Sequence, residues 1–257
     1  RLMPENDHQY PRRTIEAEDP HQNPPAPYVE LGVTTCFSFL HGSSDAVDLV
    51  ATAWELGYHA IGVADRNTMA GVVRIHAEAG KVHMRPIIGC RIELVAYPRD
   101  RAAYGRVCAL LSQGKRATPE GEWQDKGVCQ MTLRALSEHA KGIQLILMPG
   151  DDVDGLERDL PHLARALPTL RHIGASYLYQ GDDRARIAQL DRIARRHGLS
   201  ILATNDVHYH APDRSPLQDV MTCIRHKTTI RDAGYLLHAN AERHLKPPSE
   251  MQRLFAD

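Results

Sequence analysis

The sequence predicts an α/β fold in which strands and helices alternate around a barrel of parallel strands. Between residues 28 and 204, short apolar runs alternate with segments whose apolar residues recur at helical spacing. This repeated order is typical of right-handed βα units on a parallel sheet. About seven such units fit this part of the chain, which favours a closed barrel over an open sheet.

Strands are expected where several apolar or β-branched residues run together before a polar stop. Residues 85–97 are long enough for one long strand or a pair of strands. The predicted strands are residues 28–36, 59–64, 85–97, 143–148, 170–177 and 200–204.

Helices are expected where apolar residues recur every three or four positions. Gly57 is the expected C-cap of the helix over residues 45–56, and Thr132 is the expected N-cap of a later one. The predicted helices are residues 45–56, 69–79, 101–113, 132–140, 154–167, 184–197, 212–225 and 248–255.

Composition excludes few functions but sets the context. The 257 residues can bury a large core, and a net charge of −1 gives no overall signature of a nucleic-acid binder. Five scattered cysteines without a CxxC pair indicate reduced thiols in a cytoplasmic protein. No apolar stretch approaches a membrane span, and the first residues do not form a signal peptide. The start without Met predicts a piece of a longer protein.

Three regions are expected along the chain. Residues 1–27 are polar and rich in proline, and we interpret them as a flexible N-terminal arm. Residues 28–211 form the predicted barrel. After the last strand the pattern changes, and residues 212–257 are predicted to be a helical extension.

The most informative stretch is SILATNDVHYH, residues 200–210, where an apolar run stops at Asn205. Asp206 and His208 follow that strand two residues apart and combine a carboxylate with an imidazole, ligands that suit a hydrolytic metal site. Asp65 follows another strand, although an Asp there also favours capping of the next helix. His41 is a possible ligand, but a loop histidine facing solvent is the favoured interpretation.

Other functional motifs are missing from the sequence. It contains no GxxxxGK[ST], GxGxxG, HExxH or GxSxG pattern. Basic residues cluster loosely at Arg192, Arg195 and Arg196 and at Arg225 and Lys227, yet aromatic residues make up only 5% of the chain. Because stacking aromatics are needed to read bases, a direct nucleic-acid reader is not favoured.

Longer motifs give the chain a family resemblance. They are YVELGVTTCFSFLHGSS, LGYHAIGVADRNTMAGVVRIHAEA, PIIGCRIEL, ILATNDVHYHAPDRSPLQDVMTCIRHKTTI and NAERHLKPPSEMQRLF. Together they resemble the PHP (polymerase and histidinol phosphatase) domain of bacterial C-family DNA polymerase alpha subunits, above all the error-prone, damage-inducible branch. The last motif resembles the segment that leads into the polymerase palm.

The resemblance implies a distorted (β/α)7 barrel with up to three metals, often zinc or manganese, at the carboxyl ends of its strands. Several ligand positions of the family carry other residues in this chain. The opening His-x-His pair falls on Gly32 and Thr34, and the next acidic ligand falls on His41. The glutamate of the third strand falls on Arg91.

At the remaining ligand positions, more residues match the ligands of the family. Of the family's Asp-His pair, Asp65 is present and Arg66 replaces the histidine. Only the final Asp-x-His, Asp206 and His208, is whole. Since Arg66 and Arg91 place fixed positive charge where cations would bind, we expect them to pair with the two carboxylates. The hypothesis is a metal-free pseudo-active site with no cofactor.

These observations predict the N-terminal PHP domain of an error-prone DNA polymerase that acts in DNA damage tolerance. The fragment would have a structural and interaction role, with catalysis by palm aspartates outside it. Its expected partners are the polymerase core of the same chain, DNA through that enzyme, a sliding clamp and accessory translesion proteins, and no membrane. The alternative is a metal-dependent phosphoesterase or 3′–5′ exonuclease with zinc or manganese at a reduced site. A stand-alone phosphatase of the histidinol-phosphate type is a third, weaker hypothesis.

Overall fold

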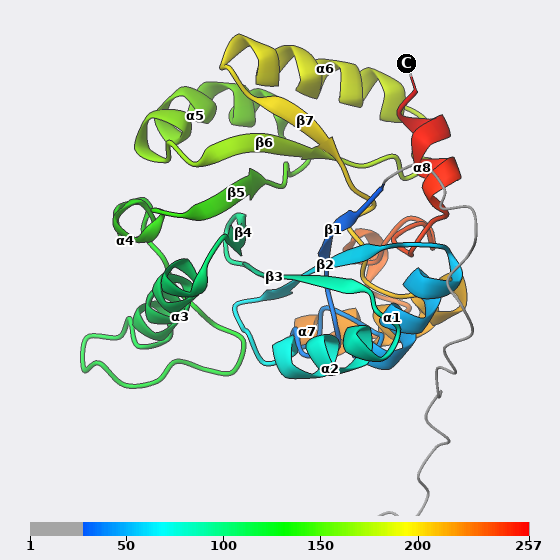
Figure 1. Cartoon of the computed structure of the whole chain (residues 1–257), viewed down its shortest axis with the longest axis horizontal. Helices are drawn as coiled ribbons and strands as arrows, with labels where there is room; N and C mark the ends of the chain where they lie inside the picture. The colour runs from blue at the N-terminus through cyan, green and yellow to red at the C-terminus, as the bar shows by residue number, and fades with distance from the viewer. Residues whose placement is uncertain (1–27, 257) are drawn as a thin grey trace, which may run out of the picture.

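The computed structural model describes residues 28–256, so the predicted arm over residues 1–27 lies outside the described residues. Within them, one curled sheet of seven strands has a spatial order that follows the sequence order (Figure 1). The strands are β1 (Glu30–Val33), β2 (Ala60–Arg66), β3 (Arg85–Arg91), β4 (Val95–Pro98), β5 (Ile143–Leu147), β6 (Leu170–Ala175) and β7 (Ser200–Ala203).

Helices cover the outside of the curled sheet (Figure 1). They are α1 (Ala46–Glu55), α2 (Val72–Lys81), α3 (Arg101–Lys115), α4 (Leu133–His139), α5 (Val153–Ala166), α6 (Asp183–Arg196), α7 (Ser215–His226) and α8 (Pro248–Leu254), with short 3-10 turns at Pro212–Arg214 and Gly234–Leu236. The predicted α/β fold is therefore confirmed, in the form of a curled half-barrel of seven strands. None of the helices in residues 28–256 is long and apolar enough to cross a membrane.

The prediction of parallel strands throughout was wrong for β4. This strand runs antiparallel to both β3 and β5, whereas the other neighbouring pairs of the described sheet are parallel. The reason is the connection: only residues 92–94 separate β3 from β4. A connection this short can form a hairpin, but a parallel crossover needs a dozen or more residues.

The two edges of the sheet meet through side chains, because no ladder joins β1 to β7 within the described residues. The fully buried carboxylate of Glu30, on β1, accepts hydrogen bonds from the Thr204 hydroxyl and, at 3.0 Å, from the Asn205 backbone N–H. The Thr204 hydroxyl is also 2.8 Å from the Leu31 carbonyl oxygen, and Thr34 N–H donates to the Val207 carbonyl at 2.8 Å. We call this junction the seam.

The interior of the curl is apolar and is crossed by one tyrosine. Tyr97, on β4, is packed with Ala64, Val95 and Ile146. Its ring lies so close to Gly89 that a Cβ there would approach it to 2.5 Å, so the position requires glycine. Across the curl, the Tyr97 hydroxyl accepts a hydrogen bond from Gly32 N–H at 2.7 Å. Tyr97 thereby ties the middle of the sheet to β1.

The segment that follows α7 returns to the carboxyl ends of the strands. His208 N–H donates to the Arg243 carbonyl at 2.9 Å, and Tyr209 forms an isolated bridge with His244. The Tyr58 hydroxyl donates to the Lys246 carbonyl at 2.7 Å. Residues of the predicted extension therefore pack directly against the predicted barrel at the carboxyl ends of its strands.

Glu30 gives the seam a predicted pH dependence. Burial raises the pKa of this carboxyl to about 7, from an ordinary value of 4.5, despite the hydrogen bonds that favour its charged form. Because the folded protein holds the proton more tightly than the unfolded chain, stability is greatest below pH 4.5 and falls as pH rises towards 7. Glu30→Gln removes this loss, which corresponds to about 3 kcal/mol.

Urea unfolding of both proteins at pH 5 and pH 8 measures the effect. We compare the free energy of unfolding of Glu30→Gln with that of the unmutated chain. The difference in favour of the variant should be larger at pH 8 than at pH 5. Glu30→Ala, the control, loses the seam contacts at both pH values. If the free energies of unfolding of the Glu30→Gln variant and the unmutated chain differ by the same amount at both pH values, the assignment of this pKa is contradicted.

Candidate functional site

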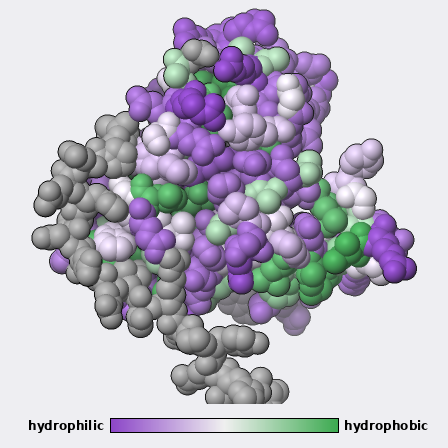
Figure 2. Space-filling model, turned by 90° about the vertical axis from the view of Figure 1, so that its right-hand side faces the viewer, coloured by the Kyte–Doolittle hydropathy of each residue, from purple (hydrophilic) through white to green (hydrophobic). Residues whose placement is uncertain are grey.

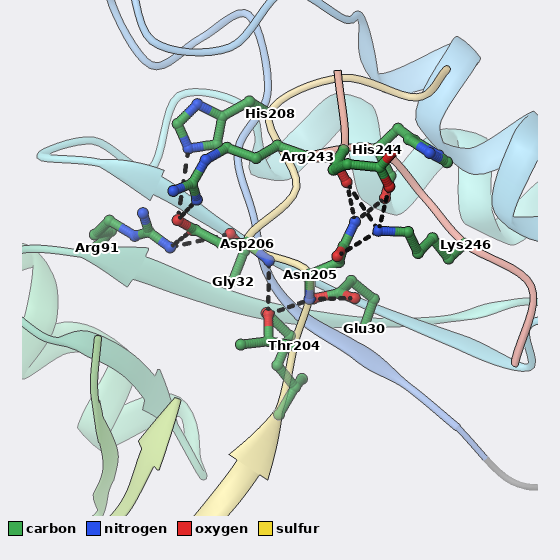
Figure 3. Close-up of polar contacts among 12 residues, drawn as sticks. Glu30, Gly32, Arg91, Thr204, Asn205, Asp206, His208, Arg243, His244 and Lys246 are labelled. Atoms are coloured by element: carbon green, nitrogen blue, oxygen red, sulfur yellow. Dashed lines mark hydrogen bonds and ion pairs between the residues drawn. The ribbon is translucent and has the colours of Figure 1, made fainter. Parts of the chain in front are cut away.

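The centre of the site is Asp206, which lies between two guanidinium groups (Figure 3). One carboxylate oxygen accepts a hydrogen bond from Arg91 and the other accepts one from Arg243. Asp206 follows β7, Arg91 ends β3, and Arg243 comes from the segment between α7 and α8. Three distant parts of the chain thus meet in one ion-pair cluster.

Electrostatics keep Asp206 charged in this enclosed place. Burial alone would raise the pKa of its carboxyl, but the positive charges of Arg91 and Arg243 outweigh burial and hold the pKa far below its ordinary value. Asp206 has a φ of 46°, in the left-handed region that Asp tolerates better than most residues. The cluster has two fixed positive charges for one negative charge.

His208 lies beside Asp206 as a neutral imidazole. Its Nε2 is 3.9 Å from Asp206 Oδ2, and burial, with help from the nearby guanidiniums, lowers its pKa well below the ordinary value. Neither ring nitrogen has a hydrogen-bond partner among the described residues. The ring of His238 meets that of His208 edge to face, with centroids 5.1 Å apart, and burial lowers the pKa of His238 to about 4.

Gly32 and Thr34 occupy the positions at which the family resemblance places imidazoles. Gly32 has a φ of 89°, and a Cβ added there would lie 3.4 Å from the guanidinium of Arg91. Arg91 therefore takes space next to Gly32, and a larger side chain at this position would be strained as well. Thr34 is buried at the seam.

Asp65 is satisfied without an arginine, and Arg66 forms no ion pair with Asp65 or Asp206 among the described residues, which corrects the expectation that both arginines pair with these carboxylates. The Asp65 carboxylate accepts hydrogen bonds from Thr35 N–H at 2.8 Å, from the Thr35 hydroxyl at 2.9 Å and from the Ser38 hydroxyl at 2.7 Å. Neighbouring residues of a strand point to opposite faces, so Arg66 is directed away from Asp65. The ordered turn after β1 takes the place of the expected cation.

His41 lies among guanidiniums. Arg225 Nη1 is 2.9 Å from His41 Nδ1 and also donates to the Leu40 carbonyl at 2.8 Å. Burial, followed by the charges of Arg225, Arg66 and Arg91, lowers the pKa of His41 to about 3. The structure thus places His41 near the positive side chains and does not bring it to either carboxylate by any described contact.

The side chains at the strand ends do not fit a cluster of two or three metals. No group of three or more His, Cys, Asp or Glu side chains in residues 28–256 is arranged to hold a metal ion. Both oxygens of Asp206 are engaged by arginines, and those of Asp65 by hydroxyl and amide donors. The unpartnered nitrogens of His208 and Nδ1 of His238 are the remaining imidazole donors among the described residues, and the charges of Arg91 and Arg243 act on His208.

The sequence interpretation missed a second polar network behind Asp206 (Figure 3). The ammonium of Lys246, only 1% exposed, donates to Asn205 Oδ1 at 3.0 Å and pairs with the Glu242 carboxylate at 2.9 Å. Arg243 was missed too. Both cations lie in the NAERHLKPPSEMQRLF motif, and their alternation with Glu242 in a segment of few apolar residues was the available signal.

Comparison with known families and proteins agrees with the fold. The family model for the PHP domain matches residues 30–168. An error-prone DNA polymerase of Bradyrhizobium sp. (strain ORS 278) is 46% identical over 246 residues, which cover 91% of this chain and 21% of that protein. One from Caulobacter vibrioides is 43% identical over 90% of this chain and 22% of its own length. The chain thus spans about a fifth of the relatives it matches.

Two solved structures share the fold at low identity. An amidohydrolase from Chromobacterium violaceum has a TM-score of 0.55 and 14% identity, over 70% of this chain and 87% of that one. A Bifidobacterium adolescentis protein, for which metal-dependent phosphoesterase activity has been suggested, has a TM-score of 0.51 and 15% identity, over 72% and 89%. These likenesses support the fold of the part of the chain that they cover.

The ion-pair cluster predicts a large cost for removing either arginine. Arg91→Met or Arg243→Met leaves the buried Asp206 with one partner, so we expect a loss of about 3 kcal/mol at pH 7. The matched control is Arg134→Met, whose ion pair with Glu138 lies on the surface with the arginine 88% exposed. That change should cost less than about 1 kcal/mol.

Chemical denaturation of the three variants checks this prediction. The loss in the Arg91 and Arg243 variants should shrink below pH 3.8, where Asp206 in the unfolded chain is protonated. Equal losses in the buried and the surface variants would mean that the cluster does not stabilise the fold.

Proposed function

The chain belongs to the PHP domain family, and from this premise we propose that it is the PHP domain of an error-prone DNA polymerase with a structural, non-hydrolytic role. In this proposal the domain supports the polymerase core, which makes DNA elsewhere in the longer protein. The proposal places it in the cytoplasm, in DNA synthesis past damage.

The observation that carries the non-hydrolytic role is the pair of arginines on Asp206. Metal-dependent phosphoester hydrolysis uses ions held by several carboxylates and imidazoles to activate water and to neutralise the leaving oxygen. In this chain Arg91 and Arg243 engage both oxygens of the carboxylate that such ions would need. A cation entering the site would have to displace a guanidinium and meet the charge of the second one.

One observation favours the second candidate, a phosphoesterase or 3′–5′ exonuclease with a reduced zinc or manganese site. The buried ring nitrogens of His208 and Nδ1 of His238 have no hydrogen-bond partner among the described residues. Neutral imidazoles are good ligands for these metals. This candidate requires a metal held by the two histidines with at most one oxygen of Asp206.

An exposed apolar surface supports the interaction role. Leu217, Val220 and Ile224 lie at helical spacing along α7, and Ile230 and Leu236 follow in the next turns, all exposed. Figure 2 shows a band of hydrophobic residues towards the lower right of the face that it draws. A monomeric protein rarely leaves so many neighbouring apolar side chains uncovered. The matched part of this chain is about a fifth of the relatives' length, so we assign this surface to the polymerase core.

The proposal includes further partners that this chain would meet only through the longer polymerase. DNA is the substrate of the polymerase as a whole, and a sliding clamp and accessory translesion proteins would act through its other domains. None of them is needed to explain the geometry of the Asp206 cluster.

The hydrolytic role has a direct test. The purified chain is incubated with Mn²⁺ or Zn²⁺ and a DNA primer labelled at its 5′ end, and the products are separated by gel electrophoresis. We expect no shortening above the level of a buffer control, and elemental analysis should find less than one metal ion per chain. Asp206→Ala and the surface variant Asp159→Ala should behave alike.

The outcomes separate the two candidate functions. Shortening that Asp206→Ala abolishes and Asp159→Ala retains would establish the reduced-site nuclease and overturn the non-hydrolytic role. Shortening that persists in both Asp206→Ala and His208→Ala marks a contaminating nuclease, and repurification then decides.

The interaction role predicts a defect in the full-length polymerase. Val220→Asp combined with Ile224→Asp places two charges on the apolar face of α7. We expect lower thermal stability of the polymerase and faster proteolysis between its domains. The matched control is Val73→Asp on α2, a position 77% exposed and outside this surface. If both proteins melt and are cleaved like the unmutated one, α7 does not contact the polymerase core.

A further inference from the structure

A separate cavity of about 340 Å³ opens beside the strand ends. Its walls come from residues 36–39 after β1, residues 66–70 at the end of β2, the end of α3 and the loop that follows α3. Its volume falls within the range of small-ligand pockets. The residues of the Asp206 cluster do not line it.

The cavity is positively charged. Arg66, Lys115 and Lys126 line it, and no Asp or Glu is among its described lining residues. None of the three cations takes part in an ion pair within residues 28–256. Cations without counter-charges in a hollow surface focus a potential that attracts anions.

Its walls are fixed to one another. Arg66 N–H donates to the Ser38 hydroxyl at 2.8 Å, which joins the β2 wall to the turn after β1. Asn67 N–H donates to the Arg91 carbonyl at 2.8 Å, and the Asn67 amide donates to the Gly127 carbonyl at 3.1 Å. Because these segments are cross-linked, the backbone that carries Arg66 and Lys126 is held in place before any ligand binds.

Aromatic rings complete the lining. Phe37 and Phe39 are two of the three phenylalanines in the chain, and both line the cavity. Phe39 is 41% exposed, and the Lys126 ammonium lies 4.5 Å from the centre of its ring. Exposed rings next to cations are how proteins bind single-stranded nucleic acid, with bases on the rings and phosphates on the cations.

We propose that this cavity binds a nucleotide unit of single-stranded DNA. The phosphate lies between Arg66, Lys115 and Lys126, and the base packs against Phe39. Three cations suit the charge and the several acceptor oxygens of a phosphate, and the guanidinium of Arg66 can donate two parallel hydrogen bonds to it. This site is independent of the non-hydrolytic role proposed for the Asp206 cluster.

The test is fluorescence anisotropy of a labelled oligothymidylate with the whole purified chain at low salt. Arg66→Gln combined with Lys126→Gln should weaken binding at least about tenfold and flatten the salt dependence by about 0.7 in log–log slope, since one phosphate is no longer neutralised. The control, Arg192→Gln with Arg195→Gln on α6, removes the same charge elsewhere and should bind like the unmutated chain. Lys126→Gln alone, on an exposed loop, provides the same comparison if the double variant is less stable.

The base contact is tested separately. Phe39→Leu keeps the apolar bulk and removes the ring, so we expect affinity to fall at least about fivefold. Phe255→Leu changes the one phenylalanine outside the cavity and should have no effect. In competition, dTMP should displace the oligonucleotide at a lower concentration than inorganic phosphate.

Each outcome bears on the proposal. Unchanged affinity in the Arg66 and Lys126 variants relative to the α6 control overturns the site. Unchanged affinity in Phe39→Leu, or equal displacement by dTMP and inorganic phosphate, overturns the nucleotide assignment and leaves a general anion site. The nuclease assay has no influence on these results, so the two proposals fail separately.

Discussion

The structure depends on how a curled sheet is closed when its first and last strands do not pair. The segment from Thr204 to His208 performs this closure. Thr204 and Asn205 donate to the buried Glu30 of β1, and the Val207 carbonyl accepts from Thr34. Asp206 lies within the same five residues, so its position is set by the seam. Retention of the Asp-x-His pair therefore needs no catalytic explanation, because the same backbone turn holds the barrel together.

The arginines at the strand ends act as fixed counter-charges. A buried carboxylate without a partner is costly, and Asp206 has two partners from distant segments. The position of Gly32 is coupled to this solution, because Arg91 occupies the space beside it. Restoring a histidine at Gly32 alone would require an unfavourable backbone angle and movement of Arg91. Gly32 and Arg91 are thus linked in packing, and Arg91 and Asp206 in charge.

Local pattern was enough to predict the strands and helices, because each has its own periodicity and stop signals. The reversed β4 lay inside one predicted strand region, since a three-residue hairpin leaves little trace in an apolar run. At the site, the residues after β7 were predictable, whereas Arg243 comes from a segment that only the folded chain brings near. The expectation that Arg66 pairs with one of the two carboxylates was wrong, because strand alternation directs it away from Asp65 and Arg243 pairs with Asp206 beside Arg91. A single sequence does not determine the direction of a side chain or the contacts between distant segments.

These charges also explain how binding and hydrolysis can be separated in one scaffold. Metal ions at the strand ends would supply both positive potential and an activated water. Guanidinium and ammonium groups supply the potential alone, because their charge is fixed and they cannot generate hydroxide. Arg91 and Arg243 act on Asp206, and Arg66, Arg91 and Arg225 act on His41, so this end of the barrel carries several fixed positive charges. Under the proposed non-hydrolytic role, these charges would supply potential without an activated water.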